Sequence, residues 1–589
     1  MKEKITKVIE SAIKENGVEA MIPDQENFGH YSTNVAMRMA RQVSGVRLKV
    51  LDGKKGDNKR QETSRGNAVD LARELAEKIL AEAPKGMFEK IEAAPPGFIN
   101  FWLLKEFLLK EFSLLSKSKN FGKTNLGKAK KVIFEYSDPN IAKRMHVGHL
   151  RATIIGDALA NIYEFCGYKV IRWNYIGDWG TQFGKMIAAY KLWGDKLAIQ
   201  KNPIEELQKL YVKFHEEMER NPDLEKRGQE EFKKLEDGDK ANKKLWEWFQ
   251  KESLKEFDKL YKTLGVKFDV TIGEAFYEKE LKKLVADLKK KKIARESEGS
   301  LIVDLERFGL PPALIQKSDG ASLYMTRDIA NIKYRLAKYK PVKMFYVVGN
   351  EQSLHFEQLF RVAEILKLDR SELKHLKFGL VLDEDGKKFA TREGRVVLLD
   401  ELLSKVIRLA RETVDKKNSS LPLKDKEKIA EEVGIGALKY NDLKENRHSD
   451  MTFNWGQMLN ISGNSGPYLQ YTYARLASIL GKNKKQITNN KKTKPDFKLL
   501  DKKEELDLIR KILGFPDTVL EAHKSLLTSN FCSYLYELCN LANRFYETTP
   551  VLGDKNVARM KARLALIVQV NLVLEKGLGL LGVKVLKSI

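Results

Sequence analysis

The clearest pattern in the chain is an apolar stripe at four-residue spacing, formed by Leu150, Ile154, Ala158, Ile162 and Cys166. This spacing predicts an amphipathic helix that begins near His149. An apolar run at 131–137 precedes the stripe, and a second run at 168–174 follows Gly167. Both runs are typical of buried strands. The order strand, loop, helix, strand predicts half of a nucleotide-binding α/β sheet.

The same order returns later in the chain. Strands are predicted at 344–350 and 376–383, with a helix from Ser353 between them. Highly charged helical segments at about 196–300 separate the two halves, and we expect them to be inserted into the sheet. The expected fold class is α/β, with a Rossmann-like core at 126–400.

The flanking regions differ from the core. Residues 1–125 predict a small α/β domain with a helix at the N-terminus, a Gly-, Lys- and Asn-rich loop at 44–66, and a further helix at about 67–82. A turn at 95–97 then enters a strand. From residue 401 the pattern is helical, with a polar stretch at 481–497 that predicts a loop.

Composition limits the class of protein. The 589 residues predict about three or four domains of roughly 150 residues each. Lys and Arg number 106 against 81 Asp and Glu, giving a net charge of +25. This excess fits a polyanionic partner, because basic side chains release counterions from phosphates. It fits a solvated, lysine-rich surface equally well.

Cysteine and hydropathy point to a reduced, cytoplasmic environment. Cys166, Cys532 and Cys539 have no zinc-ligand spacing, and their odd number argues against a disulfide framework. We therefore expect no protein-bound zinc. No apolar run is long enough to span a membrane, and the charged N-terminus does not resemble a signal peptide.

The candidate chemistry lies at His146-Val-Gly-His149, between the first predicted strand and its helix. The start of a helix offers N–H groups and a partial positive charge to phosphates. Gly148 lets a ligand approach the backbone, and the imidazoles can donate to phosphate oxygens.

Basic side chains surround this turn in the predicted fold. Lys143 precedes it, and Lys388 and Arg392 lie in a loop after the strand at 376–383. Because ligand sites lie at the carboxyl ends of parallel strands, both segments are expected at one crevice. On its own, the basic loop is more often a solvated turn.

Longer motifs carry a resemblance to a known family. The segment from Glu135 to Arg151, with 176–184 and 324–328, resembles the catalytic core of arginyl-tRNA synthetases. Lys388-Phe-Ala-Thr-Arg392 is similar to that family's version of the second class I signature. Residues 463–475 resemble the segment leading into its anticodon-binding domain. Residues 28–33 and 96–100 resemble its N-terminal domain.

The resemblance spans nearly the whole chain and implies four regions. An N-terminal α/β domain that binds the tRNA elbow is expected at 1–125, and a class I catalytic domain at 126–400. A helical connection is expected at 401–460, and an all-α, helical-bundle anticodon-binding domain at 461–589.

The implied activity is ATP-dependent ligation of L-arginine to its tRNA. Arginyl-adenylate is the intermediate, and AMP and pyrophosphate are released. Mg²⁺ accompanies ATP, and the family typically needs bound tRNA before it forms the adenylate. The protein is expected to be a monomer without a membrane partner.

The resemblance also implies roles in the amino-acid site. Glu135 and Asp328 pair with the guanidinium of arginine, and Tyr324 lines the same pocket. Asn140 and Gln352 hold the α-amino and carboxylate groups. A guanidinium is a planar set of donors that favours carboxylates.

The remaining roles concern phosphates and tRNA. His146 and His149, with Lys143, Lys388 and Arg392, are implied to bind ATP and to stabilise its α-phosphate during reaction. Gly148 makes room for adenine and ribose. For tRNA, Phe98 and Asn100 are implied at the elbow, and Tyr468, Tyr471 and Arg475 at the anticodon.

Several residues keep a structural alternative. Function and helix capping are equally supported for Gln352, and capping of the next helix is favoured for Asp178. His30 and His355 are expected to be structural or surface residues. Tyr468 and Tyr471 have helical spacing, which more often means core packing.

The chain departs from the family at several positions. Thr391 stands where the second signature usually has a lysine, a loss that Lys143 is thought to compensate, and Asp138 stands where a serine is common. Asp138 either strengthens binding of the amine or contacts solvent.

Two rival functions remain. Another class I synthetase is disfavoured because zinc-binding cysteines are missing and the insertion is too short for a large editing domain. A paralogue that binds tRNA without catalysis is disfavoured by the intact His146, His149, Glu135 and Asp328.

Overall fold

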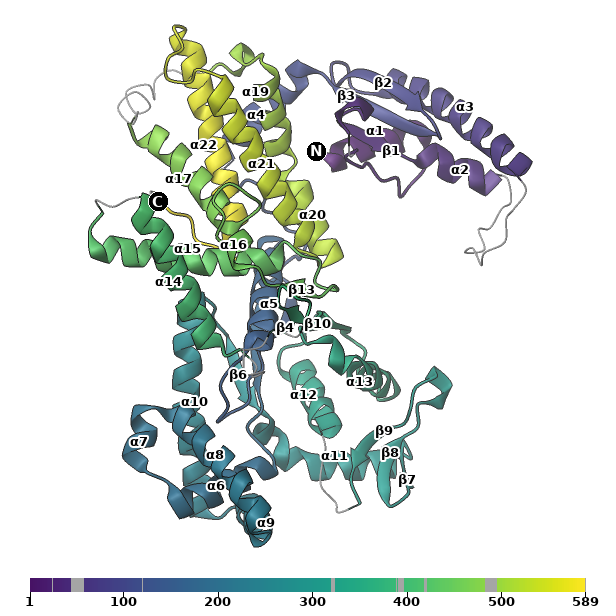
Figure 1. The fold of residues 1–589 in the computed structure, drawn as a ribbon. Helices are drawn as coiled ribbons and strands as arrows, with labels where there is room; N and C mark the ends of the chain where they lie inside the picture. Colours follow the sequence, from purple (N-terminus) through teal and green to yellow (C-terminus); the bar gives the residue numbers. More distant parts are fainter. Residues whose placement is uncertain are drawn as a thin grey trace. The chain divides into compact units, whose positions relative to one another are not determined.

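The computed structural model describes residues 1–23, 25–43, 58–118, 120–318, 324–387, 389, 397–417, 421–482 and 495–587. The chain forms two compact units (Figure 1). Unit 1 contains residues 1–122, 476–521 and 537–573, and unit 2 contains residues 123–475, 522–536 and 574–589. Each unit is therefore assembled from segments that are distant in the sequence.

A five-stranded parallel sheet forms the centre of unit 2, in the order β11–β10–β4–β5–β6. Its strands are β4 (Lys131–Glu135), β5 (Lys169–Ile176), β6 (Val270–Gly273), β10 (Lys343–Tyr346) and β11 (Glu372–His375). From β4 the chain continues toward β6, and from β10 it continues toward β11. The strand order therefore reverses between the adjacent β4 and β10, as in doubly wound sheets. The predicted α/β, Rossmann-like fold class is confirmed.

The helix predicted after the histidines is α5 (Val147–Phe165), and its apolar stripe is buried. Gly156 brings this helix against the residue that follows β4. A Cβ at Gly156 would lie 2.3 Å from Cγ of Tyr136. The close approach fixes the start of α5 relative to the end of β4.

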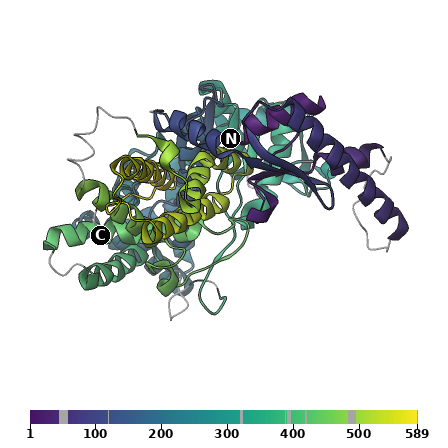
Figure 2. The ribbon, with the colours of Figure 1, turned by 90° about the horizontal axis from the view of Figure 1, so that it is seen from above.

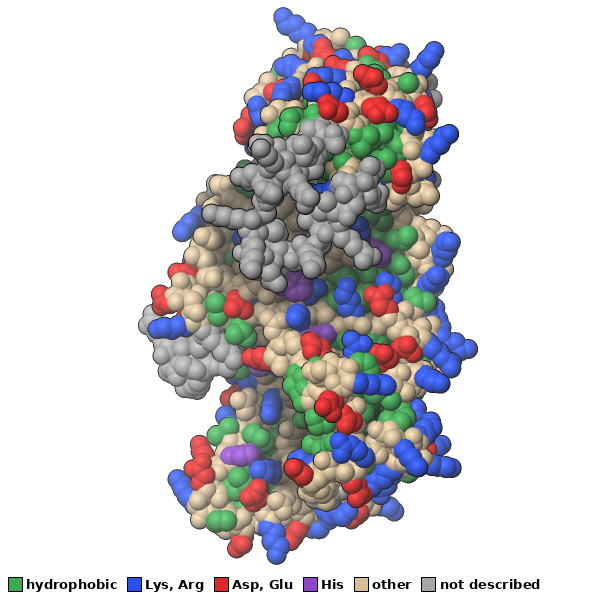
Figure 3. Space-filling view, turned by 90° about the vertical axis from the view of Figure 1, so that its right-hand side faces the viewer, with side chains coloured by type: hydrophobic (Ala, Val, Ile, Leu, Met, Phe, Trp, Pro, Cys, Tyr) green, Lys and Arg blue, Asp and Glu red, His purple; other side chains and the backbone are tan. Residues whose placement is uncertain are grey.

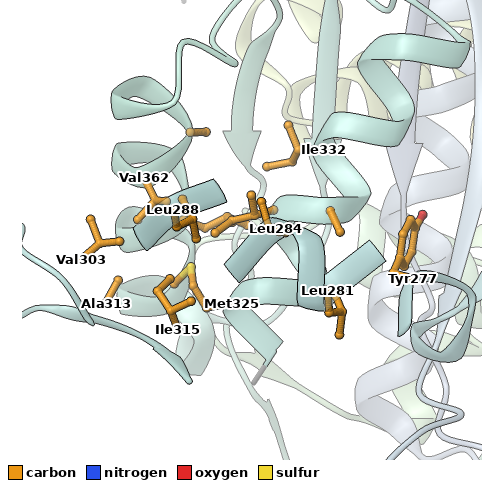
Figure 4. Close-up of a cluster of buried hydrophobic side chains, with 14 of the residues drawn as sticks. Tyr277, Leu281, Leu284, Leu288, Val303, Ala313, Ile315, Met325, Ile332 and Val362 are labelled. Atoms are coloured by element: carbon orange, nitrogen blue, oxygen red, sulfur yellow. The ribbon is translucent and has the colours of Figure 1, made fainter. Parts of the chain in front are cut away.

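A hydrophobic core joins three helices to a small antiparallel sheet in unit 2 (Figure 4). The helices are α11 (Glu278–Lys290), α12 (Tyr324–Lys338) and α13 (Ser353–Ile365). The sheet contains β7 (Ala294–Ser297), β8 (Ser300–Val303) and β9 (Ala313–Gln316). Leu284 and Leu288 of α11 lie close to Met325 of α12 in this core. The core therefore fixes α12 beside this antiparallel sheet.

The charged insertion is helical, but it ends earlier than residue 300. Its helices are α6 (Thr181–Trp193), α7 (Lys196–Lys201), α8 (Pro203–Arg220), α9 (Asp223–Glu236) and α10 (Lys240–Leu264). The following β6 belongs to the main sheet, where it pairs with β5. A strand this short gave no periodic signal in the sequence.

The strand predicted at 376–383 is wrong in position. The chain pairs with β10 earlier, through β11, which ends at His375. It then leaves the sheet, and only β12 (Val381–Leu382) is extended, paired in parallel with β13 (Met451–Thr452). The apolar run therefore packs at a second site rather than at the sheet edge.

From residue 399 the secondary structure is mainly helical. The helices are α14 (Leu399–Lys417), α15 (Leu423–Leu443), α16 (Trp455–Met458), α17 (Gly466–Lys482), α19 (Lys503–Leu513), α20 (Phe515–Ser525), α21 (Ser529–Thr548) and α22 (Val557–Leu580). Most of the polar stretch at 481–497 (residues 483–494) lies outside the described residues.

The N-terminal part of unit 1 is a three-stranded antiparallel sheet with helices (Figures 1 and 2, purple). Its elements are α1 (Lys2–Ile13), β1 (Tyr31–Thr33), α2 (Val35–Val43), α3 (Asn58–Glu82), β2 (Phe88–Ala94), β3 (Phe98–Leu103) and α4 (Lys105–Ser116). The expected loop at 44–66 is shorter than predicted, because α3 already begins at Asn58. Residues 44–57 lie outside the described part.

Two general expectations concern membranes and thiols. Among the described residues, the search for a bilayer-spanning helix found no candidate. Cys166, Cys532 and Cys539 are buried free thiols.

Candidate active site

The candidate site lies at the carboxyl ends of β4 and β10. Glu135 and Tyr346 are register partners in the last positions of these strands. The histidine turn follows β4, and Gln352 follows β10. This is the point where the strand order reverses, and doubly wound sheets bind ligands there.

The histidines cap the start of α5 through their own side chains. The Gly148 N–H donates to Nδ1 of His146 at 3.1 Å, and the His146 N–H donates to Nδ1 of His149 at 3.1 Å. Because each Nδ1 accepts, each neutral ring carries its proton on Nε2. Burial lowers the pKa of His149 to about 3, so this ring is neutral at physiological pH. The turn can therefore present Nε2–H donors to an anion.

The segment between β4 and the histidines has an unusual backbone. Ser137, Asp138 and Ala142 have φ angles of 80°, 49° and 61°. Side chains of the insertion hold it: the Ser137 hydroxyl lies 2.8 Å from the Tyr261 hydroxyl, and the Ala142 N–H donates to Ser253 Oγ at 3.1 Å. Such conformations persist only where the surroundings enforce them.

Asn140 and Lys143 occupy exposed positions on this segment. Oδ1 of Asn140 lies so close to Gly177 that a Cβ there would be 2.2 Å away. The Lys143 ammonium lies 5.6 Å from the ring centroid of Tyr211 in the insertion. Asn140 is thus held against the segment after β5, and the Lys143 ammonium lies over an aromatic ring of the insertion.

Glu135 has an internal partner that the sequence analysis missed. Its carboxylate accepts a hydrogen bond from Arg335 of α12, whose side chain is fully buried. The guanidinium carbon of Arg335 lies 4.3 Å from the ring centroid of Trp173 and 5.6 Å from that of Tyr346. The signal was present in the sequence, because Arg335 lies seven residues after Asp328 on one helix face.

The side chain of Asp328 is more exposed to solvent than that of Glu135. Its Oδ2 is 2.7 Å from Nε2 of His355, and its side chain is 20% exposed. His355 of α13 is thus a partly exposed residue that pairs with this carboxylate, and the expectation of a structural or surface role stays a prediction.

The carboxylates of this pocket repel one another. Burial, and next the charge of Glu135, raise the pKa of Asp138 well above its usual range. Burial also raises the pKa of Glu135, against the effect of Arg335, and Asp328 raises it further. A bound cation would relieve this repulsion.

Glu274, directly after β6, extends the acidic pocket. Burial raises its pKa to about 8, and the charges of Asp328 and Asp178 act in the same direction. Its Oε2 is buried and has no hydrogen-bond partner among the residues that the structure describes. Glu274 was not predicted from the sequence, because it lies outside the motifs that resemble the family.

Asp178 does not cap α6, as the sequence favoured, since no side chain caps that helix. Its carboxylate instead accepts from the Ala275 N–H at 2.9 Å and from Nε2 of Gln250 at 2.7 Å. It therefore ties the segment after β5 to the segment after β6.

Of four further predicted site residues, two are exposed and two lie outside the described part. Tyr324 is 62% exposed at the start of α12. Gln352 is exposed and makes no capping hydrogen bond to α13, so the capping alternative is wrong. Lys388 lies outside the described residues, as does Arg392.

Comparisons with known proteins decide the family. The family model described as tRNA synthetases class I (R), catalytic domain, matches residues 111–455. The Arginyl tRNA synthetase N terminal domain matches residues 1–103, and the DALR anticodon binding domain matches residues 469–589.

Curated relatives agree over most of the chain. A protein named "Arginine--tRNA ligase" from Halothermothrix orenii is 42% identical over 87% of this chain and 89% of its own length. A protein of the same name from Fusobacterium nucleatum is 40% identical over 97% and 95%. This chain belongs to the arginyl-tRNA synthetase family.

Solved structures of the family have the same fold. The arginyl-tRNA synthetase of Plasmodium falciparum matches with a TM-score of 0.78 at 28% identity, covering 100% of this chain and 99% of that one. The Thermus thermophilus enzyme matches with a TM-score of 0.81 over the whole of both chains. Its identity is 24%, so it supports the fold alone.

The residues that the family resemblance directs at tRNA differ in exposure. Phe98 is half-buried at the start of β3, whereas Asn100 is only 3% exposed in the middle of the sheet. Asn100 therefore lacks an exposed side chain for the predicted contact. Tyr471 is exposed on α17, and Tyr468 packs against Tyr536.

Surface charge and metal ligands add two observations. On the face shown in Figure 3, Lys and Arg side chains alternate with Asp and Glu rather than forming one patch. Among the described residues, a search for groups of three or more His, Cys, Asp or Glu able to hold a metal found none.

Proposed function

We propose that this protein ligates L-arginine to its tRNA in two steps, with ATP as the energy source. The observation that carries the proposal is an acidic pocket beside the start of α5, which the two histidines cap. Both lie where the strand order reverses, at the carboxyl ends of β4 and β10. The pocket suits a cationic amino acid, and the helix start suits a nucleotide phosphate.

In the first step, the arginine carboxylate attacks the α-phosphate of ATP and pyrophosphate leaves. His146 and His149 donate from Nε2 to the phosphate oxygens as negative charge grows on them. Lys143, Lys388 and Arg392 add positive charge, and Mg²⁺ accompanies ATP. Gly148 leaves room for the nucleoside. Such catalysis consists of positioning and electrostatic stabilisation.

In the second step, a ribose hydroxyl at the 3′ end of the tRNA attacks the arginyl carbonyl, and AMP leaves. Adenylate formation depends on bound tRNA. Phe98 contacts the tRNA elbow, and Tyr468, Tyr471 and Arg475 contact the anticodon. The exposure of Tyr471 supports its contact, because unpaired bases stack on accessible aromatic rings.

Arginine recognition is divided among the carboxylates. Asp328 pairs with the guanidinium, because its side chain is accessible and its partner, His355, can be displaced or can share the site. The negative charge of Glu135 attracts the bound guanidinium at longer range, while the carboxylate stays hydrogen-bonded to Arg335. Tyr324 lines the pocket, and Asn140 and Gln352 hold the amino and carboxylate groups.

The organisation of the whole protein is part of the proposal. We retain a tRNA-elbow domain at 1–125, a catalytic domain at 126–400, a connection at 401–460 and an anticodon-binding domain at 461–589. The family-model matches at 1–103 and 469–589 support separate N-terminal and C-terminal domains, whereas the catalytic-domain match at 111–455 includes most of the proposed connection. The protein acts as a monomer in the cytoplasm.

The test is arginine-dependent exchange between ATP and pyrophosphate, with each of the twenty amino acids offered in turn. Only arginine is expected to support exchange, and only when tRNA is present. Exchange with another amino acid would refute the substrate assignment. Exchange without tRNA would refute the tRNA dependence alone.

A single substitution separates the enzyme from a binding module. His149→Ala is expected to abolish aminoacylation while tRNA binding is retained, because His149 is placed at the phosphate and not at the tRNA. Full aminoacylation by this variant would contradict the role of the histidine turn.

A further inference from the structure

Arg151 lies two residues after His149 on α5 and is 1% exposed. Its guanidinium donates four hydrogen bonds to three separate parts of the chain. Nε donates to Asp442 Oδ1 at 3.1 Å, and Nη2 donates to the Ser449 carbonyl at 3.2 Å. Nη1 donates to the carbonyls of Gly379 and Leu380 at 2.6 and 3.1 Å. One side chain therefore joins the helix of the histidine turn to 379–380 and to 442–449.

The two bonded segments also hold each other. The Gly379 N–H donates to the Arg447 carbonyl at 3.0 Å, and the Leu380 N–H donates to Asp450 Oδ1 at 2.7 Å. They continue as the paired strands β12 and β13. A Cβ at Gly379 would lie 2.6 Å from Asp450 Oδ1, so the two segments are too close for any side chain at this position.

Asp442 connects this junction to α15, of which it forms part of the last turn. α15 in turn packs tightly on α17. Nε2 of Gln470 donates to the Glu432 carbonyl at 3.1 Å, and a Cβ at Gly466 would lie 2.5 Å from the Gly436 carbonyl oxygen. A continuous series of contacts therefore leads from α17 through α15 and Arg151 to α5.

The chemistry of the junction makes Arg151 hard to replace. Asp442 is 4% exposed on its side chain, and burial raises its pKa while Arg151 opposes that shift. Removing the partner leaves a buried charge without compensation. A lysine keeps the charge but cannot donate in three directions at once, since it lacks the planar fork of a guanidinium.

We propose that Arg151 is a positioning residue that couples the tRNA-contacting helix α17 to the histidine turn, and so makes adenylate formation respond to bound tRNA. The proposal rests on the proposed function. It assigns Arg151 no contact with substrate. A change at α17 reaches His146 and His149 through α15 and α5, which the Arg151 guanidinium joins beside the histidine turn, in keeping with coupling through packed contacts.

The test compares Arg151→Lys and Asp442→Asn with the unchanged protein, using unfractionated tRNA. Both variants are expected to bind tRNA within about twofold of the unchanged protein and to keep the arginine KM. Their tRNA-stimulated ATP–pyrophosphate exchange is expected to fall at least about tenfold in kcat. Asp442→Asn keeps an acceptor of the same shape, so the test survives if Arg151→Lys fails to fold.

The matched control is Glu231→Gln in the insertion. Glu231 is also a buried acid, paired with Lys191 at 2.5 Å, but among the described residues it makes no hydrogen bond to α5, α15 or residues 379–380. The Glu231→Gln variant is expected to have a lower unfolding temperature but unchanged stimulation of ATP–pyrophosphate exchange by tRNA.

The outcomes separate the two proposals. If the unchanged protein shows no arginine-dependent exchange, the proposed function fails. If its exchange occurs but needs no tRNA, or if both junction variants keep full stimulation, the role of Arg151 is overturned. A uniform loss of tRNA binding, arginine binding and exchange would also overturn it, because that pattern indicates only damage to the fold.

Discussion

At the scale of residues, the acidic pocket contains an arginine side chain of the protein itself. Arg335 lies between Trp173 and Tyr346 and hydrogen-bonds to Glu135. The aromatic faces stabilise its charge, and the carboxylate compensates it. The two carboxylates predicted to bind one guanidinium therefore differ: Glu135 is already paired with Arg335, while Asp328 remains accessible.

This difference predicts unequal effects of two similar substitutions. Asp328→Asn removes a charge-assisted hydrogen bond worth about 1.5–3 kcal/mol, so the arginine KM should rise roughly 10- to 150-fold. The ATP KM should change little. Steady-state exchange kinetics measure both, with Glu364→Gln at an exposed ion pair as the control. An equal rise in the two KM values would contradict the assignment.

Glu135→Gln should act mainly on stability. Without its carboxylate, Arg335 is a buried charge lacking a partner, and the free energy of unfolding should fall by about 3–5 kcal/mol. Chemical denaturation measures this loss, and arginine KM on the folded fraction should rise less than in Asp328→Asn. If Glu135→Gln is as stable as the unchanged protein, the pairing of Arg335 with Glu135 does not stabilise the fold.

The sequence located the site better than it described the bonds within it. His146, Gly148, His149 and Asn140 lie in one contiguous motif, so their proximity could be predicted. Arg335 and His355 reach the pocket only because α12 and α13 fold back beside β4 and β10. Side-chain pairing across such sequence distances depends on helix rotation, which apolar periodicity does not fix to within one residue.

At the scale of elements, one glycine sets how closely helix α5 packs against the end of β4. Gly156 is surrounded by the Tyr136 ring, and its missing side chain sets the distance between α5 and the end of β4. Glycine lowers intrinsic helix stability, so its presence in mid-helix indicates that packing outweighs propensity.

Two helical glycines give a matched comparison. Gly156→Ala places a methyl 2.3 Å from a side-chain ring atom and should destabilise the protein by about 1–3 kcal/mol or more. Gly579→Ala on α22 meets no atom within 4 Å and should stabilise by up to about 1 kcal/mol. Thermal unfolding measures both. Destabilisation of equal size in the two variants would show that contact with Tyr136 is not the cause.

Elements with long periodic signals were predictable and short ones were not. α5 was expected from its stripe, and β4 and β5 from apolar runs. β6 has four residues and was absorbed into the insertion, and the run at 376–383 was assigned to the wrong sheet. In both cases tertiary pairing, rather than local pattern, decided where the strand lies.

At the scale of the whole molecule, buried histidines predict how stability varies with pH. Burial lowers the pKa of His149 to about 3, and those of His375 and His523 to about 4. The unfolded chain takes up these protons near pH 6.5, whereas the native protein does not until much lower pH. Their contribution is therefore full above pH 6.5 and declines as the pH falls toward 4.

His523 offers the test. The centroids of the His523 and Tyr163 rings lie 4.2 Å apart, and the buried Nε2 of His523 has no hydrogen-bond partner within the described parts of the chain. His523→Phe keeps an aromatic ring but cannot bind a proton. The variant should lose less stability than the unchanged protein between pH 7 and pH 5, by up to about 2 kcal/mol. Denaturant midpoints at the two pH values measure the difference, and parallel losses in the two proteins would contradict it.

Residues 580–584 complete the packing of unit 2, and this affects the stability of any chain that lacks them. The carbonyls of Leu580, Gly582 and Lys584 accept from Asn161, Lys439 and Gln470, which lie on α5, α15 and α17. Lys439 is buried, so its ammonium lacks this partner in any chain that has not yet folded residues 580–584 into place. A chain that stops before residue 580 leaves the Lys439 ammonium and the Asp157 carboxylate without the segment that packs over them. Translation errors in this enzyme would then produce unstable, degradable fragments rather than active ones.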